Sequence, residues 1–345
     1  MKKSIVTFLI VLSALIFLIN ILTANAASEN YKIRFSSYWP PSHFLVKTAD
    51  FLASCVKERT KGKLLIEVYP SGQLYSQKES LKAVAMGSVE MSDELMDKAE
   101  VIDPIFGVGL TNTYIITSYE MAWAFLDHPV YRKIIEEAFA KKLGVKPLMY
   151  MSSGTASLLT NSKRPVKKPG DVKGMLIRVS GKSSMDKIYA MGGKATIMSS
   201  GEQIMALQRG TVDGAWTSPG DGVSRKIWEV QKYATASQSI VITHPFLINL
   251  KFFNNLPPEL QTELEACAQK SQSYGRKLLE EEEKGLLATL QSHMDLYRLT
   301  EEDSAEWEKC YAPLTEEWLK KTGENGKTLR DLMFKIRADV LARKK

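Results

Sequence analysis

The residues with the clearest chemical potential in this sequence are ones that can hold a small anion. Arg178 lies within an apolar stretch, residues 175–179, that is typical of a strand. If its guanidinium faces a cleft, it can hold a carboxylate through two parallel charge-assisted hydrogen bonds, whereas an arginine that reaches solvent has no such role. Trp216-Thr217 and Tyr38-Trp39 each place an aromatic ring beside a hydroxyl group, which suits the body of a ligand, although single tryptophans also commonly belong to a core.

Carboxylates and histidines complete the set of candidate groups. Asp93 and Glu94 can accept hydrogen bonds from hydroxyl or ammonium groups of a ligand, although exposure to solvent is the simpler expectation for both. The histidines are far apart, and none has a metal-ligand partner at helical spacing. They are His43, His128, His244 and His293. Nucleophile-elbow, P-loop and zinc-protease motifs do not occur. The sequence therefore favours binding over catalysis, with no cofactor and no metal.

Two segments, 76–90 and 199–213, follow one pattern. Each begins with Ser-x-x-Glu, which predicts a helix with a serine N-cap and a glutamate that reaches back to it. Each helix is expected to end at a glycine and to lead into a short strand. The serines are Ser76 and Ser199, and the glycines are Gly87 and Gly210. Unless the match is a coincidence of common residues, it indicates two similar lobes with a cleft between them, which is a usual place for a small-molecule site.

Alternating strand and helix patterns around these segments predict an α/β protein with largely parallel pairing. The expected strands are 31–35, 64–69, 145–151, 175–179 and 240–251. The expected helices are 44–59, 118–126, 130–143, 183–191, 221–232, 258–292, one starting at Thr300 and one over 328–343. The helix over 258–292 is about 50 Å long and should therefore span both lobes.

The chain begins with Lys2-Lys3, an apolar run over 5–22 and the small residues 24–26, which is typical of a signal peptide over 1–26. An uncleaved anchor is the alternative, since the apolar run is long. Removing the two lysines leaves 44 basic residues of 46 against 39 acidic ones, a net charge of +5. This excess is mild and lacks a dense basic tract, so nucleic-acid binding is disfavoured. We expect a periplasmic monomer.

Three cysteines, Cys55, Cys267 and Cys310, lack a C-x-x-C spacing. In an oxidising compartment a Cys267–Cys310 bridge is conceivable, but buried free thiols are the expected state.

Several ordered motifs resemble the solute-binding proteins of tripartite ATP-independent periplasmic (TRAP) transporters, the DctP-like family. The motifs are GKLLIEVYPSGQL at 62–74, RPV at 164–166, DVKGMLIRV at 171–179 and ALQRGTVDG at 206–214. The resemblance implies two α/β lobes with mixed sheets that close around a small organic acid, and a long helix that braces both. It also implies a membrane permease as partner, with Arg178 matching the family arginine that binds the ligand carboxylate.

Family lobes exchange near residues 155, 244 and 284. The resemblance thus implies a first lobe over 27–155 and 244–283, and a second lobe over 156–243 and 284–345. His244 lies at one exchange and joins the candidate site. Leu158 stands where sialic-acid binders of the family carry a second arginine, which disfavours sialic acid and favours a monocarboxylate with an apolar body. A sensor built on the same fold and a secreted α/β enzyme are the rival interpretations.

Overall fold

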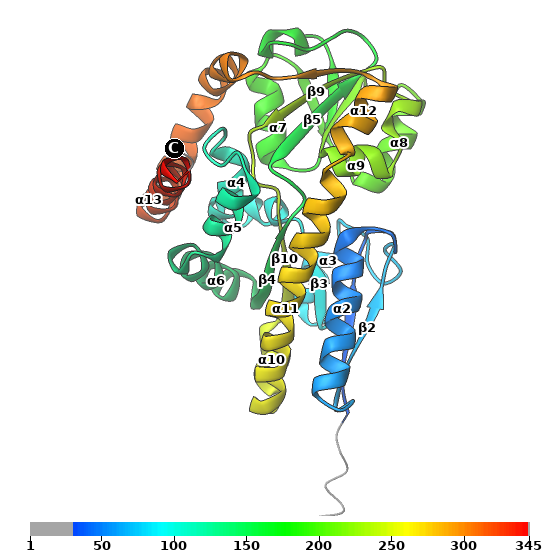
Figure 1. Cartoon of the computed structure of the whole chain (residues 1–345), viewed down its shortest axis with the longest axis vertical. Helices are drawn as coiled ribbons and strands as arrows, with labels where there is room; N and C mark the ends of the chain where they lie inside the picture. The colour runs from blue at the N-terminus through cyan, green and yellow to red at the C-terminus, as the bar shows by residue number, and fades with distance from the viewer. Residues whose placement is uncertain (1–29, 344–345) are drawn as a thin grey trace, which may run out of the picture.

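The first of two mixed sheets has strand order β2-β1-β3-β10-β4. A computed structural model describes residues 30–343, which contain both sheets (Figure 1). The predicted signal peptide lies outside the described residues. In the first sheet β1 pairs in parallel with β2 and β3, while β10 runs antiparallel to both β3 and β4. The strands are β1 (Tyr31–Ser36), β2 (Leu64–Tyr69), β3 (Met91–Asp93), β4 (Val145–Ser152) and β10 (Thr243–Asn249).

The second sheet, in the order β11-β9-β5-β8-β6-β7, repeats this arrangement. Here β6 pairs in parallel with β7 and β8. Strand β5 runs antiparallel to both of its neighbours, β8 and β9. The strands are β5 (Ala156–Asn161), β6 (Leu176–Val179), β7 (Lys194–Ile197), β8 (Gly214–Thr217), β9 (Tyr233–Gln238) and β11 (Asp295–Arg298). We call the part built around the first sheet the first lobe and the part around the second sheet the second lobe. The predicted two-lobe α/β fold is confirmed.

The repeated sequence pattern occupies equivalent places in the two lobes. It produces α3 (Ser80–Met86) before β3 and α8 (Ser200–Gln208) before β8. In the second copy Ser199 and Glu202 form the expected capping box. In the first copy Glu79 also binds back to Ser76, but residues 77–79 form a turn, so the helix begins three residues later than predicted.

Helices pack around both sheets (Figure 1). The remaining α-helices are α2 (Phe44–Arg59), α4 (Val108–Thr111), α5 (Tyr119–Asp127), α6 (Pro129–Leu143), α7 (Lys182–Ala190), α9 (Pro219–Ser224), α10 (Leu250–Asn255), α11 (Pro258–Glu283), α12 (Leu286–His293) and α13 (Glu301–Ala342). Short 3₁₀ helices are η1 (Met96–Val101), η2 (Pro104–Gly107), η3 (Pro169–Val172) and η4 (Ile227–Glu229). None of the helices within residues 30–343 combines the length and apolar character needed to cross a lipid bilayer.

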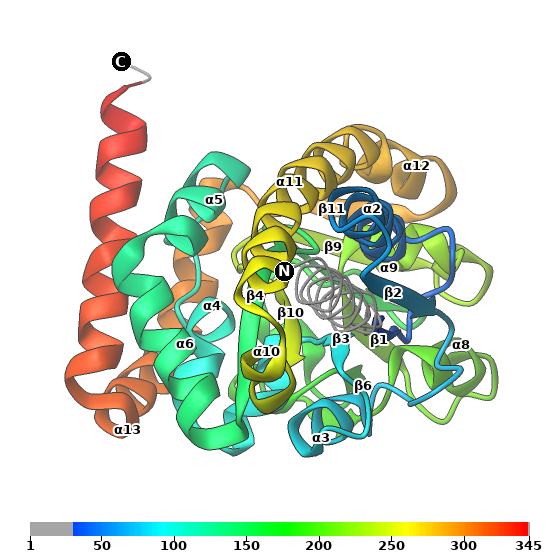
Figure 2. The same ribbon diagram turned by 90° about the horizontal axis from the view of Figure 1, so that it is seen from below.

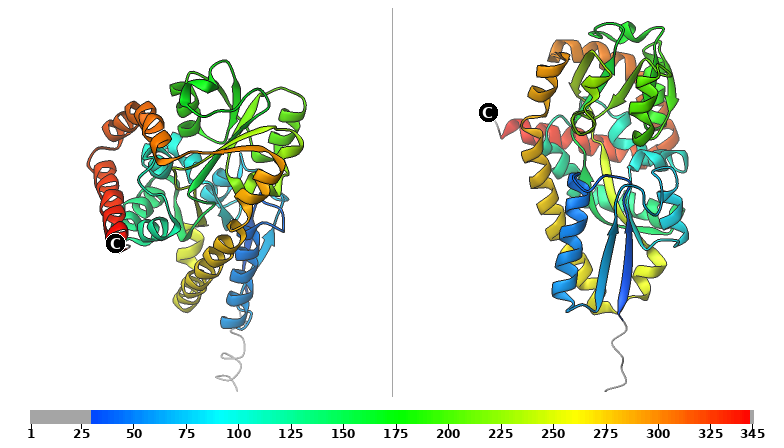
Figure 3. Two further views of the ribbon diagram at one scale, coloured as in Figure 1. Left: turned by 45° about the horizontal axis from the view of Figure 1, so that its top comes forward. Right: turned by 90° about the vertical axis from the view of Figure 1, so that its right-hand side faces the viewer.

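The predicted continuous helix over 258–292 is wrong in one respect, because it is divided at Lys284-Gly285 into α11 and α12. Glycine is a poor helix former, which favours a break at this point. The α11 helix runs beside α2 in the first lobe (Figure 3), and α12 continues into the second lobe against α9. The bracing role therefore belongs to two consecutive helices.

A second predicted helix, over 221–232, is also wrong. Ser218 caps α9 by accepting a hydrogen bond from the Asp221 amide, and the helix starts at Pro219. It ends at Ser224 because Lys226 adopts a left-handed conformation with φ of 49°. Only the short η4 follows.

The last helix, α13, packs against both lobes. Thr300 and Asp303 form its predicted capping box. Gly323 has non-helical backbone angles and divides the helix into two parts. Trp307 and Tyr311 in the first part belong to the core of the second lobe. The second part lies beside α5 and α6 (Figure 2) and supplies five side chains to the core of the first lobe, Leu329, Leu332, Met333, Ile336 and Val340.

The cysteine prediction is wrong. Cys55 on α2 and Cys267 on α11 form a disulfide with an S–S distance of 2.05 Å, and Cys310 is the free thiol. The two bonded cysteines are 212 residues apart in sequence. Only the packing of α11 along α2, which the sequence pattern did not predict, brings them together.

Candidate functional site

The carboxyl ends of the parallel strands from both lobes border one cavity. In open α/β sheets this edge is where ligands bind, because loops and helix N-termini converge there. Strands β1 and β3 are followed by Trp39 and Asp97, whereas β6 contributes Arg178 and β8 leads to Ser218. The cavity is lined by Trp39, Gln77, Leu95, Asp97, Leu110, Ser153, Arg178, Ser180, Ser184, Ser200, Trp216, Thr217, Ser218, Asp221, Ile240, Ile242 and His244.

Arg178 is the cation of this cavity and is only 1% exposed. Its Nε donates to the Met198 carbonyl oxygen at 2.9 Å, and Nη1 donates to the Gln203 side-chain oxygen at 2.7 Å. Nη2 donates to the Ser200 hydroxyl at 3.3 Å. These bonds fix the plane of the guanidinium before any ligand arrives. The predicted placement of Arg178 toward an interlobe cleft, rather than toward solvent, agrees with this position.

Every hydrogen bond of Arg178 goes to a neutral oxygen. Within residues 30–343 no carboxylate forms an ion pair with it. Burial lowers the pKa of Arg178 to about 10, partly opposed by the charges of Asp221 and Asp97, so the side chain remains cationic at neutral pH. Asp221 is itself paired with Arg225 at 2.6 Å. The cavity therefore contains a buried positive charge with which no carboxylate of residues 30–343 forms an ion pair.

Trp216 and Thr217 line the cavity as predicted, but both are also engaged elsewhere. The Trp216 ring is part of the second-lobe core and is 7% exposed. The Thr217 hydroxyl donates to Asp221 Oδ2 at 2.6 Å, so a ligand would meet the hydroxyl oxygen as an acceptor. Leu158 does not line the cavity; it belongs to a core cluster of the second lobe, although it pairs in register with Thr217.

Trp39 and His244 line the cavity from the first lobe. Their rings make an edge contact at 6.0 Å, and Trp39 also stacks on His43 at 4.0 Å. His244 Nε2 lies 3.0 Å from the Ser153 hydroxyl. Burial lowers the pKa of His244 to about 3, which keeps the ring neutral at physiological pH. It is therefore available for hydrogen bonding without adding charge.

Tyr38, Asp93 and Glu94 do not line the cavity. The expectation that the two carboxylates are exposed is wrong, because both are at most 1% accessible. Glu94 accepts hydrogen bonds from the hydroxyls of Ser80 and Ser92, and burial raises its pKa to about 8. Asp93 accepts from Ser37, and burial raises its pKa to about 7. Both carboxylates therefore accept hydrogen bonds from hydroxyls of the first lobe.

Sequence reasoning missed Gln77, Asp97 and Asp221 as lining residues. Gln77 lies inside the first repeated segment, directly after Ser76, so the repeat contained a usable signal. Asp97 lies on η1, an element for which the sequence shows no periodic pattern. Asp221 was predicted as the first residue of a helix over 221–232, and it lies in the first turn of the shorter helix α9, beside the cavity.

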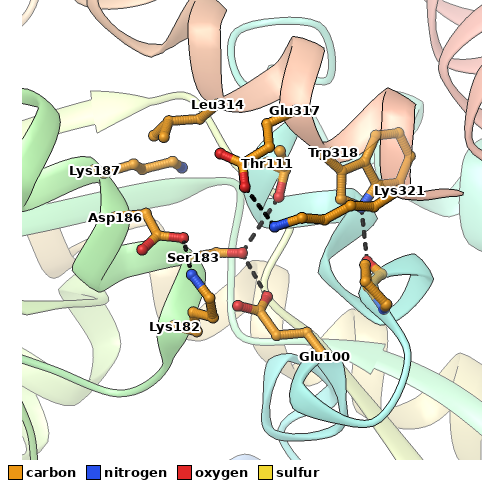
Figure 4. A pocket seen from close by; sticks show the side chains of 11 residues that line it. Glu100, Thr111, Lys182, Ser183, Asp186, Lys187, Leu314, Glu317, Trp318 and Lys321 are labelled. Atoms are coloured by element: carbon orange, nitrogen blue, oxygen red, sulfur yellow. Dashed lines mark hydrogen bonds and ion pairs between the residues drawn. The ribbon is translucent and has the colours of Figure 1, made fainter.

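A second cavity lies where α7, η1 and α13 meet, and its charged side chains are largely paired (Figure 4). Lys182 pairs with Asp186 and Lys321 with Glu317, each at 2.5 Å. Lys187 differs, because it is 3% exposed and its Nζ lies 5.8 Å from the centre of the Trp216 ring and 5.4 Å from that of Tyr311. Burial lowers the pKa of Lys187 to about 7. This lysine thus supports Trp216 from behind the main cavity.

Within the described part of the chain, no three His, Cys, Asp or Glu side chains come together in a group that could hold a metal ion. The residues that line the main cavity offer hydrogen bonds, a positive charge and apolar contacts.

Known proteins resemble this chain over most of its length. The model of the bacterial extracellular solute-binding protein family 7, DctP, matches residues 35–322. The C4-dicarboxylate-binding periplasmic protein DctP of Rhodobacter capsulatus is 27% identical over 313 residues, which cover 88% of this chain and 90% of that protein.

Two solved structures extend the comparison. A Bordetella pertussis extracytoplasmic solute receptor that binds pyroglutamic acid has a TM-score of 0.81 at 23% identity, covering 88% of this chain and 99% of that one. A TRAP periplasmic solute-binding protein from Sulfurospirillum deleyianum with bound succinate has a TM-score of 0.79 at 25% identity, covering 90% and 99%. The predicted resemblance is confirmed. The chain belongs to the bacterial extracellular solute-binding protein family 7 and is a DctP-like solute-binding protein of the TRAP type.

Proposed function

We propose that this protein captures a small organic acid in the cavity between its lobes, with Arg178 holding the carboxylate, and delivers it to the permease subunits of a TRAP transporter. The observation that carries the proposal is the buried Arg178 guanidinium, which forms no ion pair within residues 30–343. A buried charge is costly unless it is paired. A ligand carboxylate would supply that partner.

The arrangement around Arg178 favours an anion of limited size. The apolar side chains of Leu95, Leu110, Ile240 and Ile242 line the same cavity, so a ligand with a short carbon body would bury apolar surface while its carboxylate meets the guanidinium. Trp39 and Trp216 supply flat surfaces from the first and second lobes. Tyr38 and Glu94, which lie outside the cavity, are not part of this proposal.

Lobe closure would follow from ligand contacts that exist only when both lobes are in place. Trp39 and Gln77 approach from the first lobe and Arg178 and Trp216 from the second. A ligand that touches both sets binds the closed state more tightly than the open state and so shifts the population toward closure. The closed surface would then be what the permease recognises.

Relatives support the ligand class. The proteins named above bind C4-dicarboxylates, pyroglutamic acid or succinate, and all of these ligands carry a carboxylate. Membership of an extracellular solute-binding family supports a location outside the cytoplasm.

A binding screen tests the proposal. Purified protein would be heated with a panel of organic acids, since a ligand at 100 times its Kd stabilises the fold by about 2.7 kcal/mol. Any acid that gives a shift is then titrated by calorimetry into wild type, Arg178→Ala, Arg178→Lys and the control Arg209→Ala, which removes an exposed arginine of the same lobe.

We expect Arg178→Ala to weaken binding by about 100-fold or more, because it removes a charge-assisted contact in a desolvated site. Arg178→Lys should bind with intermediate affinity, because it keeps the charge but loses the fork geometry. Arg209→Ala should bind as wild type does. Wild-type affinity in Arg178→Ala, or binding of neutral sugars but of no acid, would contradict the proposal.

A further inference from the structure

Three polar atoms of the cavity-lining residues are buried and have no hydrogen-bond partner within residues 30–343. They are Trp39 Nε1, Asp97 Oδ1 and His244 Nδ1. Buried polar atoms are almost always hydrogen-bonded in folded proteins, so groups left without a partner indicate where a ligand or water belongs. Together with the unpaired charge of Arg178, these atoms indicate which polar groups a ligand should carry.

Asp97 says most about the ligand, because its carboxyl group lines a cavity that is proposed to hold an anion. It belongs to η1 in the first lobe and is 3% exposed. Its Oδ2 accepts a hydrogen bond from the Ser180 hydroxyl of the second lobe at 3.3 Å. A Cβ placed on Gly181 would lie 2.6 Å from the same Oδ2, so the carboxylate is held tightly against the other lobe. The second oxygen, Oδ1, is the one left without a partner.

Asp97 and Arg178 face the same cavity from opposite lobes, but they do not form an ion pair with each other. Because both groups line the same cavity, the Arg178 charge lowers the pKa of Asp97 and the Asp97 charge raises the pKa of Arg178. A group inserted between them would meet a cation on one side and a hydrogen-bond acceptor on the other. A simple dicarboxylate fits this arrangement poorly, because its second carboxylate would face the Asp97 carboxylate with no hydrogen-bond donor between them.

We propose that the ligand is an organic acid with an N–H or O–H donor close to its carboxylate, and that Asp97 Oδ1 accepts this donor. The inference rests on the proposed function, since it assumes that Arg178 holds the carboxylate. Trp39 Nε1 offers a donor to an acceptor on the same ligand. A lactam acid and a 2-hydroxy acid share this chemistry, whereas succinate and simple fatty acids lack the donor.

The burial of Asp97 strengthens the selection. Desolvation raises the pKa of its carboxyl group above the ordinary value, partly opposed by the Lys98 charge. A donor from the ligand replaces the hydrogen bonds that water would otherwise supply. A ligand without that donor leaves Oδ1 buried and unpaired. Sites built to hydrogen-bond a ligand discriminate strongly against analogues that lack the matching group.

Matched ligand pairs test the inference on the wild-type protein. Calorimetry would compare pyroglutamate with its lactone analogue, in which a ring oxygen replaces the N–H, and lactate with propionate, which lacks the hydroxyl. We expect the donor-bearing member of at least one pair to bind about 10- to 100-fold more tightly, as for a buried hydrogen bond to a charged group. The first pair reports an N–H donor and the second an O–H donor.

Variants locate the effect at Asp97. In Asp97→Ala the preference within a pair should fall to about two-fold or less, and Asp97→Asn should retain part of it through the amide oxygen. The exposed control Asp331→Asn should keep the full preference. A preference that persists in Asp97→Ala would overturn the assignment of Asp97.

The outcomes separate the inference from the proposed function. Equal affinity for both members of each pair, with binding still dependent on Arg178, overturns this inference alone. Tighter binding of succinate than of either donor-bearing acid also overturns it alone. Failure of every carboxylate to bind wild type overturns both. The wild-type comparison stands even if the Asp97 variants do not fold.

Discussion

The side chain of Gln77 in the first lobe accepts a hydrogen bond from the backbone amide of Ser200 in the second lobe, with an Oε1–N distance of 3.1 Å. Ser200 is the first residue of α8, so its amide has no partner within the helix. Next to this contact, Lys78 Nζ lies 3.1 Å from Glu202. The starts of the two repeated segments therefore touch each other between the lobes, at the edge of the cavity.

This contact predicts that Gln77 stabilises the closed form. Gln77→Ala should weaken ligand binding by about five- to ten-fold, because closure would then leave the buried Ser200 amide without a partner. Calorimetry with the best organic acid measures this effect. Lys78→Ala is the matched control at the neighbouring position, and it should change Kd by about two-fold or less because exposed ion pairs contribute little. A larger effect for Lys78→Ala than for Gln77→Ala would refute this account of closure.

Glu94 predicts a loss of stability as pH rises. Burial raises its pKa to about 8 from an ordinary value of 4.5, so the contribution to stability is complete below pH 4.5 and is lost as pH rises toward 8. Asp93 and Glu100, both raised to about 7 chiefly by burial, act in the same direction. In urea unfolding, Glu94→Gln should be more stable than wild type at pH 8.5 by about 2 kcal/mol, and this advantage should be absent at pH 4.5.

The control for this measurement is Glu281→Gln, which changes an exposed glutamate on α11. Its unfolding free energy should follow that of wild type at both pH values. If the difference between Glu94→Gln and wild type is the same at pH 4.5 and pH 8.5, the buried carboxyl is not the group that titrates.

The disulfide between α2 and α11 predicts a large effect of reduction. The Cys55→Ser, Cys267→Ser double variant should lose about 2 to 4 kcal/mol of unfolding free energy, because the bond closes a very long loop in the unfolded chain. Cys310→Ser should be close to wild type in stability. Thiol titration of the denatured protein should find one reactive thiol before reduction and three afterwards. Three thiols before reduction would mean that the bond does not form.

Local patterns predicted most elements, and their failures have identifiable causes. The helix over Phe44–Arg59 and the strand over Leu64–Tyr69 have the bounds that their periodicity indicates. The helix expected over 221–232 failed because the left-handed Lys226 gives no signal in side-chain type. The Cys55–Cys267 bond could not be predicted because it depends on how two distant helices pack.

The candidate site also contains residues that the sequence predicted and residues that it did not. Arg178, Trp216, Thr217, Trp39 and His244 line the cavity. Their residue types were visible in the sequence, as were the expected strands on or near which they lie. Glu94 seemed an equivalent candidate because it follows a short strand, yet its side chain is held away from the cavity by Ser80 and Ser92. Asp97 carries no local signal, since its role depends on the other lobe approaching it.

The second part of α13 has a consequence for how the chain is made. The core of the first lobe, which begins near the amino end, is completed by Leu329, Met333 and their neighbours close to the carboxyl end. Synthesis is vectorial, so this lobe cannot finish its core until nearly the whole polypeptide has emerged. Such long-range contacts also slow folding. A nascent chain of this protein should therefore stay incompletely folded, and dependent on protection from aggregation, until its last helix is available.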